Sequence, residues 1–382
     1  LGYKPVVFEA EGKPGGMLLQ AIPAYRLPRD ILDREIQGIA DQGVTIRTKK
    51  RLGRDFTLES LREQGFEAVY VAVGAPTGMA LGMKGEDLEG VVDSMRFLRE
   101  YNLGGRVKVG AHVVVVGGGN AAVDAARSAL RLGAKTATVV YRRTRAEMPA
   151  FEEEVHEAER EGVKFEFLAA PVELVEKAGK VSAVKFRTME LGNFDRTGRR
   201  KPVAKGENDF TLPADTVIAA IGQTLDTADL FGNAGIVSLA SAPPKLNERH
   251  YLAADPVTGQ TSVEWVFAGG DAATGPASVV EAIGAGERAA AGMDRYLTGA
   301  DHAAWRSYRV ADTFFDPEAE PVMGTRPAVK MIPVVQRKGS FAEVELGWTR
   351  ATALGETRRC LRCDYREPAE ATASKTPAAA AH

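Results

Sequence analysis

Cysteine is scarce in this chain: Cys360 and Cys363 are its only two cysteines among 382 residues. A secreted protein held together by disulfide bonds needs more, so this scarcity favours a cytoplasmic protein. No run of eighteen apolar residues occurs, which argues against a membrane-spanning helix, and we expect no signal peptide. The net charge of −2 supplies no broad basic field that would recruit nucleic acid or a membrane.

The remaining composition is that of an ordinary globular protein, with 45% apolar and 26% charged residues. The length allows two domains with substantial cores. The chain begins at Leu1 instead of methionine, and its first residues resemble the end of a helix, so we expect a fragment or a trimmed chain. Residues 364–382, rich in Ala, Pro and Thr, are expected to be disordered because they bury little apolar surface.

The stretch from Ala111 to Ala150 has the order strand, glycine-rich turn, helix, strand. Four consecutive valines, Val113 to Val116, suit a strand buried on both faces of a parallel sheet. A helical pattern follows from Ala121 to Leu132, and a second strand is expected from Thr138 to Tyr141. This order is that of the strand–helix–strand unit in dinucleotide-binding folds.

The turn between the first strand and the helix carries the pattern Gly117-x-Gly119-x-x-Ala122. The first glycine permits the tight turn, the second lets the backbone approach a pyrophosphate, and the small third residue lets helix and strand pack closely. The anion then meets the positive end of the helix. The pattern predicts a dinucleotide site made by Gly117, Gly118, Gly119, Asn120 and Ala121.

Two arginines, Arg142 and Arg143, directly follow the second strand. An acidic residue at this place binds the ribose hydroxyls of NAD, whereas arginine suits the 2′-phosphate of NADP. We therefore predict that the site binds NADPH through both arginines.

A second dinucleotide-binding unit is indicated near the start of the chain. Residues Tyr3 to Glu9 form a short apolar strand that ends in an acid, like the second strand of a Rossmann unit whose opening strand and glycine turn are missing. Glu9 would bind the ribose hydroxyls of an adenosine, or it is an ordinary solvated charge. Gly16, Met17 and Leu18 follow in a glycine-rich segment that would lie against a flat ligand or form a plain loop.

Two predicted strands end in glycine at equivalent places: Phe66 to Val73 before Gly74, and Asp215 to Ile221 before Gly222. This repetition implies two dinucleotide-binding domains of similar plan.

A further strand, Trp265 to Ala268, opens into Gly270 and Asp271, and a helix starts near Ala277 to Val279. An aspartate at such a strand end can accept hydrogen bonds from a ribityl chain. The free amides of the helix start can hold negative charge on a reduced flavin, helped by the positive end of the helix dipole. The alternative is an ordinary turn.

Three other segments carry weaker predictions. The charged helix from Glu147 to Glu161 is expected to be a solvated face, not a catalytic carboxylate cluster. Residues 163–213 alternate in strand-like fashion, so we expect an antiparallel excursion that covers the sheet. Residues 304–359 indicate a wrapping extension with one short helix.

Cys360 and Cys363 have the spacing of half a metal or cluster site, and a complete site needs about four ligands. Three interpretations stay open: ligands of a 4Fe–4S cluster completed by a missing segment or a partner, a dithiol redox pair, or unligated thiols. The five histidines show no matching pair.

Five blocks of the sequence are residues 14–28, 115–134, 140–150 (VYRRTRAEMPA), 219–223 and 266–290. Together these blocks resemble the small-subunit glutamate synthase family of FAD-dependent NAD(P)H oxidoreductases. The resemblance implies an α/β fold with two Rossmann-like dinucleotide-binding domains, similar to adrenodoxin reductase and glutathione reductase. The NADP domain is then inserted into a discontinuous FAD domain. The implied parts are 1–104 and 226–300 for FAD, 105–225 for NAD(P)H, 301–363 as a C-terminal extension, and a tail from 364.

The resemblance also implies a hydride relay from NADPH to FAD in which no side chain acts as an acid or base, so we expect no catalytic residue in that sense. Besides the glycine turn and the two arginines, the expected cofactor-binding residues are Glu9, Gly16, Met17, Leu18, Gly74, Ile221, Gly222, Gly270, Asp271, Ala277, Ser278 and Val279.

The implied function is that of an electron-input flavoprotein subunit that passes electrons from NADPH to iron–sulfur centres of a partner or catalytic subunit. The chain continues beyond the helix at which glutamate synthase small subunits end, so glutamate synthesis is one candidate pathway beside other ferredoxin-linked ones. Two alternatives stay open: an NADPH-dependent disulfide reductase that uses Cys360 and Cys363, and a non-enzymatic NADPH-binding scaffold.

Overall fold

The computed structural model describes residues 1–195, 198–231, 243–302 and 325–357. The chain forms two compact units: the first comprises Leu1–His302 with Ile332–Val344, and the second comprises Ala303–Met331 with Glu345–His382. All the expected cofactor-binding residues belong to the first unit, whereas Cys360 and Cys363 lie outside the described residues. Where the chain is described, no helix is both long and apolar enough to cross a bilayer.

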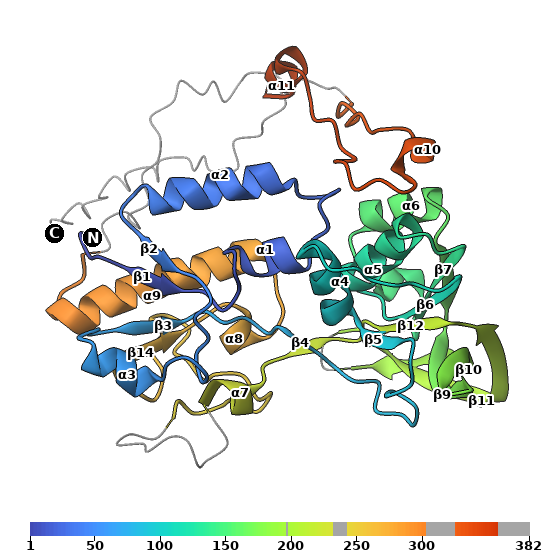
Figure 1. Ribbon diagram of the computed structural model, residues 1–382, viewed down its shortest axis with the longest axis horizontal. Coiled ribbons are helices and arrows are strands. Elements are labelled where there is room, and N and C mark those ends of the chain that lie inside the picture. Colours follow the sequence, from blue (N-terminus) through green and yellow to red (C-terminus); the bar gives the residue numbers. More distant parts are fainter. Residues whose placement is uncertain (196–197, 232–242, 303–324, 358–382) are drawn as a thin grey trace, which may run out of the picture. The chain divides into compact units, whose positions relative to one another are not determined.

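A five-stranded parallel sheet of the first unit carries the glycine-rich turn (Figure 1). Helix α5 (Asn120–Arg131) connects two neighbouring strands of this sheet, which confirms the expected strand–helix–strand unit. All the pairings are parallel, as expected. In spatial order the strands are β5 (Val91–Asp93), β12 (Thr216–Ala219), β6 (His112–Val116), β7 (Thr136–Tyr141) and β8 (Lys164–Phe167).

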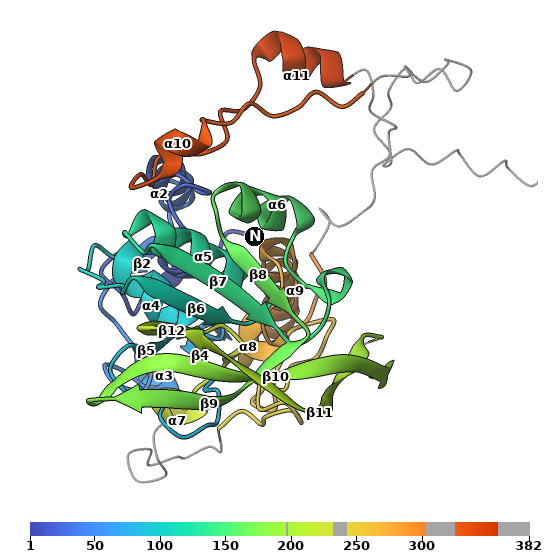
Figure 2. The same ribbon diagram turned by 90° about the vertical axis from the view of Figure 1, so that its right-hand side faces the viewer.

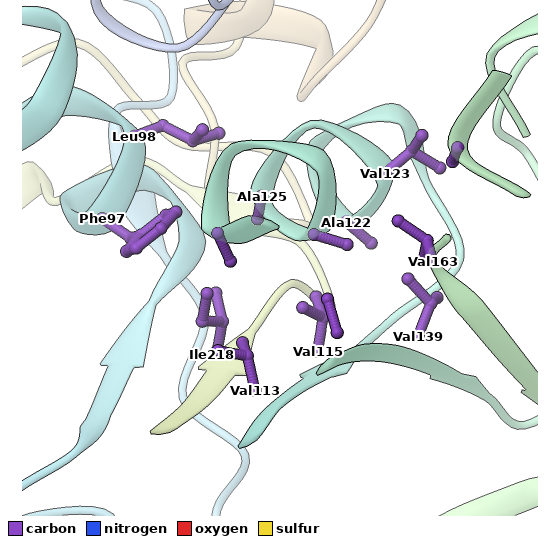
Figure 3. Packing of buried hydrophobic residues seen from close by; sticks show 14 of the residues in the cluster. Phe97, Leu98, Val113, Val115, Ala122, Val123, Ala125, Val139, Val163 and Ile218 are labelled. Carbon is purple, nitrogen blue, oxygen red and sulfur yellow. The ribbon is translucent and has the colours of Figure 1, made fainter. Parts of the chain in front are cut away.

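One face of the sheet is covered by helices. Val113 and Val115 of β6 pack in one buried cluster with α5, α4 (Ser94–Asn102) and α6 (Glu152–Arg160). Figure 3 shows Ala122 of α5 facing the strands beside Val115, where its small side chain lets the helix approach the sheet. Each fully buried valine stabilises the fold by roughly 1.5–3 kcal/mol, so this packing holds the start of α5 firmly.

The opposite face is covered by a three-stranded antiparallel sheet of β9 (Ala169–Lys177), β10 (Lys180–Phe194) and β11 (Arg200–Pro213), which Figure 2 shows as long crossing arrows. Val114 and Val116 point to this side and pack with buried residues of β9 and β10. The expected antiparallel excursion is thus confirmed, with one correction. Strand β8 pairs in parallel with β7 and so belongs to the main sheet.

Four strands of the first unit form two further parallel pairs. Strand β1 (Val6–Phe8) pairs with β2 (Thr45–Arg47), and β3 (Val69–Val71) pairs with β14 (Val266–Ala268). The helices connected to these strands include α3, which Thr57 caps through a reciprocal pair of hydrogen bonds with Ser60. In chain order these helices are α1 (Gly16–Gln20), α2 (Arg29–Ala40), α3 (Leu58–Glu63), α7 (Thr227–Phe231), α8 (Asp271–Thr274) and α9 (Val279–Thr298).

The chain passes twice between these strand pairs and the five-stranded sheet, and the two passages pair with each other. Strand β4 (Thr77–Gly78) is antiparallel to β13 (Gln223–Thr224). The Met79 amide donates to the Gly222 carbonyl at 3.0 Å. The segments that follow the two predicted strand-and-glycine endings therefore lie side by side.

The segment 332–344 returns to the first unit and contains α10 (Val334–Arg337). The ring of Phe341 stacks on Tyr101 of α4, with centroids 4.1 Å apart, and the Val344 amide donates to the Tyr25 carbonyl at 3.0 Å. This part of the C-terminal extension therefore packs on the dinucleotide-type fold, while the expected short helix, α11 (Arg350–Thr357), belongs to the second unit.

Candidate functional site

The first two glycines of the turn after β6 leave no room for a side chain. Gly117 has a φ of +148°, and a Cβ there would lie 2.1 Å from the Ala220 carbonyl oxygen. A Cβ on Gly118 would lie 2.4 Å from the ring of Tyr141. Only glycine fits at either position, because the neighbouring strands β12 and β7 come this close to the turn.

The third glycine has a different environment. Gly119 is the N-cap of α5, and a Cβ there would meet only the Cγ of Pro149, at 4.0 Å. This is open room in front of the first helical turn, where backbone N–H groups and the helix dipole favour an anion. The turn therefore leaves room for a ligand at Gly119, and the pyrophosphate site at Gly119, Asn120 and Ala121 stays a prediction.

The segment after β7 folds back over this turn. The Tyr141 hydroxyl donates to the Glu147 carbonyl at 2.9 Å, and the Ala150 amide donates to the Gly118 carbonyl at 3.2 Å. The Phe151 amide donates to Oδ1 of Asn120 at 3.0 Å. The side-chain oxygen of Asn120 is thus held by the protein. The sequence indicated this segment only for its two arginines. It did not indicate that residues 147–151 fold over the glycine turn.

The two arginines after β7 have unlike surroundings. Arg142 is exposed. Arg143 is 5% exposed, and its guanidinium bonds the Arg200 carbonyl and the carboxylate of Asp195 at 2.7 and 2.8 Å. The prediction treated the two arginines alike, whereas the structure gives them different partners.

The expected FAD residues lie at the ends of three strands. Glu9 follows β1, and its carboxylate accepts a hydrogen bond from the Glu11 amide at 2.7 Å. Gly74 follows β3 and Gly270 follows β14, and because β3 and β14 pair in parallel with Val71 opposite Ala268, these two glycines lie at the same sheet edge. The β1 strand pairs only with β2 among the described strands, so Glu9 lies on a separate pair.

Other predicted positions are found on nearby elements. Gly16, Met17 and Leu18 form most of the short helix α1 and are half-buried. Ile221 is 44% exposed, and Gly222 has a φ of +151°, which favours glycine.

Asp271 begins α8, directly before the turn that leads into α9. Its Oδ1 accepts a hydrogen bond from the Ala277 amide at 3.1 Å. Burial raises the pKa of Asp271 above its ordinary value, against the lowering effect of the Ala277 amide. The Ser278 amide is also occupied, because it donates to Glu281 at 2.8 Å within the cap of α9. The expectation of three free amides at Ala277, Ser278 and Val279 is therefore wrong for the first two.

A cleft of about 310 Å³ adjoins this corner, and the sequence did not indicate it. It lies between β4, β13 and the segment that follows Asp271. Arg249 and Tyr251 anchor its wall: the Arg249 guanidinium donates to the Thr274 carbonyl, and the Tyr251 hydroxyl donates to the Gln223 carbonyl at 2.9 Å. The cleft is lined by Met79, Gln223, Thr224, Arg249, His250, Tyr251, Thr274, Gly275 and Pro276.

A buried cluster of charges lies on α5, away from the glycine turn. Arg127 and Arg131 are buried, and both donate to Glu161, with N–O distances of 2.7 and 2.5 Å. Both guanidiniums lie over the ring of Tyr25, 4.6 and 3.9 Å from its centroid. The prediction that the Glu147 to Glu161 helix is a solvated face is therefore wrong on this side. The sequence pattern predicted a solvated helix because the α5 arginines that pair with Glu161 lie about 30 positions away in the sequence.

The same cluster shifts two carboxyl pKa values in opposite directions. Burial raises the pKa of Asp124 to about 6, although the ion pair with Arg26, at 2.9 Å, acts against it. Burial also acts to raise the pKa of Glu161, but hydrogen bonds from Arg131 and Arg127 outweigh it and lower that pKa to about 2. These contacts fix the segment that contains Arg26 to the helix that begins at the glycine turn.

Within the described residues, no group of three or more His, Cys, Asp or Glu side chains could hold a metal ion. Cys360 and Cys363 lie outside those residues, so their metal assignment stays a prediction. The division into FAD-binding and NAD(P)H-binding parts also stays a prediction.

Comparisons with curated proteins find subunits of NADP- and NADPH-dependent oxidoreductases among the relatives of this chain. The chain is 41% identical over 377 residues to the NADP(+)-dependent formate dehydrogenase subunit beta of Moorella thermoacetica, covering 95% of this chain and 51% of that protein. It is 38% identical over 400 residues to the NADPH-Fe(3+) oxidoreductase subunit beta of Geobacter sulfurreducens, covering 95% and 58%. The chain thus spans little more than half the length of these relatives.

The glutamate synthase [NADPH] small chain of Escherichia coli is 33% identical over 311 residues, covering 78% of this chain and 64% of that one. This confirms the resemblance that the sequence blocks indicated. Among solved structures, FprA of Mycobacterium tuberculosis in complex with NADPH matches with a TM-score of 0.63 and 18% identity, over 77% of this chain and 78% of that one. The match confirms the predicted fold class of paired Rossmann-like domains.

The family model described as pyridine nucleotide-disulphide oxidoreductase matches residues 3–286. This range includes the glycine turn, both arginines and every expected FAD residue. The chain belongs to the pyridine nucleotide-disulphide oxidoreductase family.

Proposed function

We propose that the chain is the electron-input part of an NADPH-dependent oxidoreductase, with NADPH at the Gly117–Gly119 turn and FAD at the strand ends marked by Glu9 and Asp271. The observation that carries the proposal is the open room at Gly119, at the start of α5 and in the same strand–helix–strand unit as the exposed Arg142. When bound, FAD supplies the two-electron chemistry by accepting the hydride of NADPH.

In the NADPH site, the backbone at the start of α5 holds the pyrophosphate, because the helix dipole favours negative charge there. Asn120 and Ala121 present their amides, since the side chain of Asn120 is bonded to the Phe151 amide. Arg142 contacts the 2′-phosphate, because a guanidinium can make paired hydrogen bonds to phosphate oxygens.

In the FAD site, Glu9 binds the adenosine ribose and Asp271 binds the ribityl chain. The backbones of Gly16 to Leu18, Gly74 and Gly270 permit close approach of the cofactor. Val279, the first residue of α9, supplies an amide at the positive end of the helix dipole for negative charge on the reduced flavin. No side chain has to give or take a proton, so the protein orients and shields the cofactors.

The electrons pass on to iron–sulfur centres of a partner or catalytic subunit in the cytoplasm. The relatives named as beta subunits of a formate dehydrogenase and of an Fe(3+) oxidoreductase support a partner subunit. Their names differ in the electron acceptor, so glutamate synthesis is one of several pathways that fit. The proposal includes a 4Fe–4S cluster held in part by Cys360 and Cys363, with the other ligands from elsewhere.

The test is expression of the gene product at its full length, followed by flavin absorbance and NADPH-driven reduction of an artificial dye. We expect a yellow protein that reduces the dye with NADPH. A colourless protein that does not oxidise NADPH would contradict the proposal. Alkylation of both cysteines should spare dye reduction, whereas a disulfide reductase that uses Cys360 and Cys363 would lose its reduction of disulfides.

A further inference from the structure

The buried Arg143 connects strand β7 to the long antiparallel sheet. Its Nε donates to the Arg200 carbonyl at 2.7 Å, at the start of β11. Its Nη2 donates to the carboxylate of Asp195 at 2.8 Å, directly after β10. The Leu168 amide donates to the Arg143 carbonyl at 3.1 Å. Backbone and side chain of one residue thus join the end of β7 to the ends of β10 and β11.

Asp195 is itself part of a closed backbone arrangement. Its amide donates to the Arg199 carbonyl at 2.7 Å, and its Oδ1 accepts from the Arg199 amide at 3.2 Å. The guanidinium of Arg200 folds back and donates to the carbonyls of Gly192 and Leu191, at 3.1 and 2.6 Å. The ends of β10 and β11 are therefore held to each other, and Arg143 is the side chain that attaches them to β7.

Arg142 differs from Arg143 in its burial and in its partners. It is exposed, and within the described ranges it makes no hydrogen bond or ion pair. The positive charge of Arg143 already faces a carboxylate that is 18% exposed in its side chain. If the Arg143 guanidinium turned toward a dianionic phosphate, it would leave the Asp195 carboxylate and the Arg200 carbonyl without their partner.

We propose that Arg143 is a positioning residue of the NADPH site: through Asp195 and the Arg200 carbonyl it fixes the ends of β10 and β11 beside Arg142, and Arg142 supplies the guanidinium that selects the 2′-phosphate. This rests on the proposed NADPH site and divides a role that the sequence assigned to both arginines. A carboxylate near a phosphate site would ordinarily oppose phosphate binding. Asp195 instead supports it, because it holds Arg143 in place and its charge is neutralised by Arg143.

One substitution, Asp195→Asn, distinguishes the two roles, because positioning and direct binding predict opposite changes in the affinity for a 2′-phosphate. If Arg143 positions, Asp195→Asn weakens the attachment of the ends of β10 and β11 to β7, because only one side-chain oxygen is left for Arg143 and the Arg199 amide. Binding of a 2′-phosphate is then weaker. If Arg143 binds the phosphate itself, the same substitution removes a negative charge and liberates the guanidinium, so binding becomes tighter. The probes are 2′,5′-ADP and 5′-AMP, which differ in the 2′-phosphate, titrated into the full-length protein by calorimetry.

We expect the protein to prefer 2′,5′-ADP. Arg142→Met should lower the affinity for 2′,5′-ADP about tenfold or more, because a charge-assisted hydrogen bond is lost, with 5′-AMP unaffected. Asp195→Asn should lower it about threefold, a smaller loss because the effect is indirect. Arg143→Lys should resemble Asp195→Asn, since one ammonium cannot reproduce the planar fork that serves two acceptors.

The matched control is Asp209→Asn, which breaks the pair of Asp209 with Arg187 at 2.9 Å on the same two strands. It should leave both affinities unchanged, and thermal unfolding confirms that each variant is folded. Equal or tighter binding of 2′,5′-ADP by Asp195→Asn, or full retention by Arg143→Lys, overturns the inference while leaving the NADPH site intact. A wild-type protein that binds neither probe overturns the proposed NADPH site itself.

Discussion

The guanidinium of Arg337 donates a hydrogen bond to the carboxylate of Glu161 at 3.1 Å, although 176 positions separate the two residues. Arg337 also pairs with Glu157 and is buried. Glu161 already accepts from Arg127 and Arg131 of α5. The C-terminal segment 332–344 thus completes a charge cluster whose other members lie on α5, α6 and the segment around Tyr25.

Arg337 is a buried member of this cluster and pairs with two of its carboxylates, Glu157 and Glu161. The buried or half-buried ion pairs of the cluster join Arg26, Arg127, Arg131 and Arg337 to Asp124, Glu154, Glu157 and Glu161. The exposed Arg160 also pairs with Glu157, at 2.7 Å. A buried ion pair that loses one partner leaves an uncompensated charge, which is strongly unfavourable.

Replacing Arg337 with methionine should therefore lower the free energy of unfolding by about 3–5 kcal/mol. Chemical denaturation followed by circular dichroism measures the change. Lys338→Met, one residue further on and exposed, is the control and should shift the free energy by about 0.5 kcal/mol or less. Equal effects of the two substitutions would contradict the role assigned to Arg337.

The stability should also depend on pH through Glu161. Its pKa is lowered in the folded state to about 2, from an ordinary value of 4.5. A lowered carboxyl pKa means stability that is present above the ordinary pKa and lost as pH falls from about 4.5 toward 2. The shift corresponds to about 3 kcal/mol, since one pKa unit is about 1.4 kcal/mol.

Denaturation curves between pH 6 and pH 2 test this dependence. Glu161→Gln should be less stable than the wild type at pH 6 and should lose less stability between pH 4.5 and 2. Glu153→Gln, on an exposed position of the same helix, should keep the wild-type slope. Asp124, with its pKa raised to about 6, increases the stability as pH falls from about 6 to 4, which is the opposite effect. Both proteins contain Asp124, so the difference between Glu161→Gln and the wild type reports on Glu161.

The glycine turn allows binding and folding to be separated. Gly119→Ala places a methyl group in open room, so we expect the free energy of unfolding to change by about 1 kcal/mol or less. The affinity for NADPH should fall about tenfold, because the methyl group occupies the space of the pyrophosphate. Gly117→Ala should destabilise the fold by about 1–3 kcal/mol from its backbone conformation alone. Thermal unfolding and NADPH titration measure both; unchanged NADPH affinity in Gly119→Ala would place the pyrophosphate elsewhere.

Asp271 offers a test of the FAD site. Asp271→Ala should lower the flavin content of the purified full-length protein severalfold, because the ribityl chain loses its acceptor and the Ala277 amide loses its partner. Absorbance of the bound flavin, relative to protein, measures this. Asp87→Ala, at an exposed position, should retain the wild-type flavin content. Equal flavin content in both variants would argue against a ribityl contact at Asp271.

Local sequence pattern determined much of this protein. The strand at Val113 to Val116, the turn at Gly117 to Gly119 and the helix that follows could be predicted, because each depends on residues within a few positions. The parallel order of β6 and β7 follows from the helix between them. The fold class and the place of the dinucleotide turn could therefore be predicted.

Only the tertiary structure decided the roles of charged side chains. Arg142 and Arg143 are neighbours of identical chemistry, yet one is exposed and the other is bonded to Asp195. The pattern around Glu161 is that of a solvated helix, and its burial depends on Arg127, Arg131 and Arg337. A charge is buried only where its partner reaches it, and that partner comes from another element whose position the local pattern does not determine.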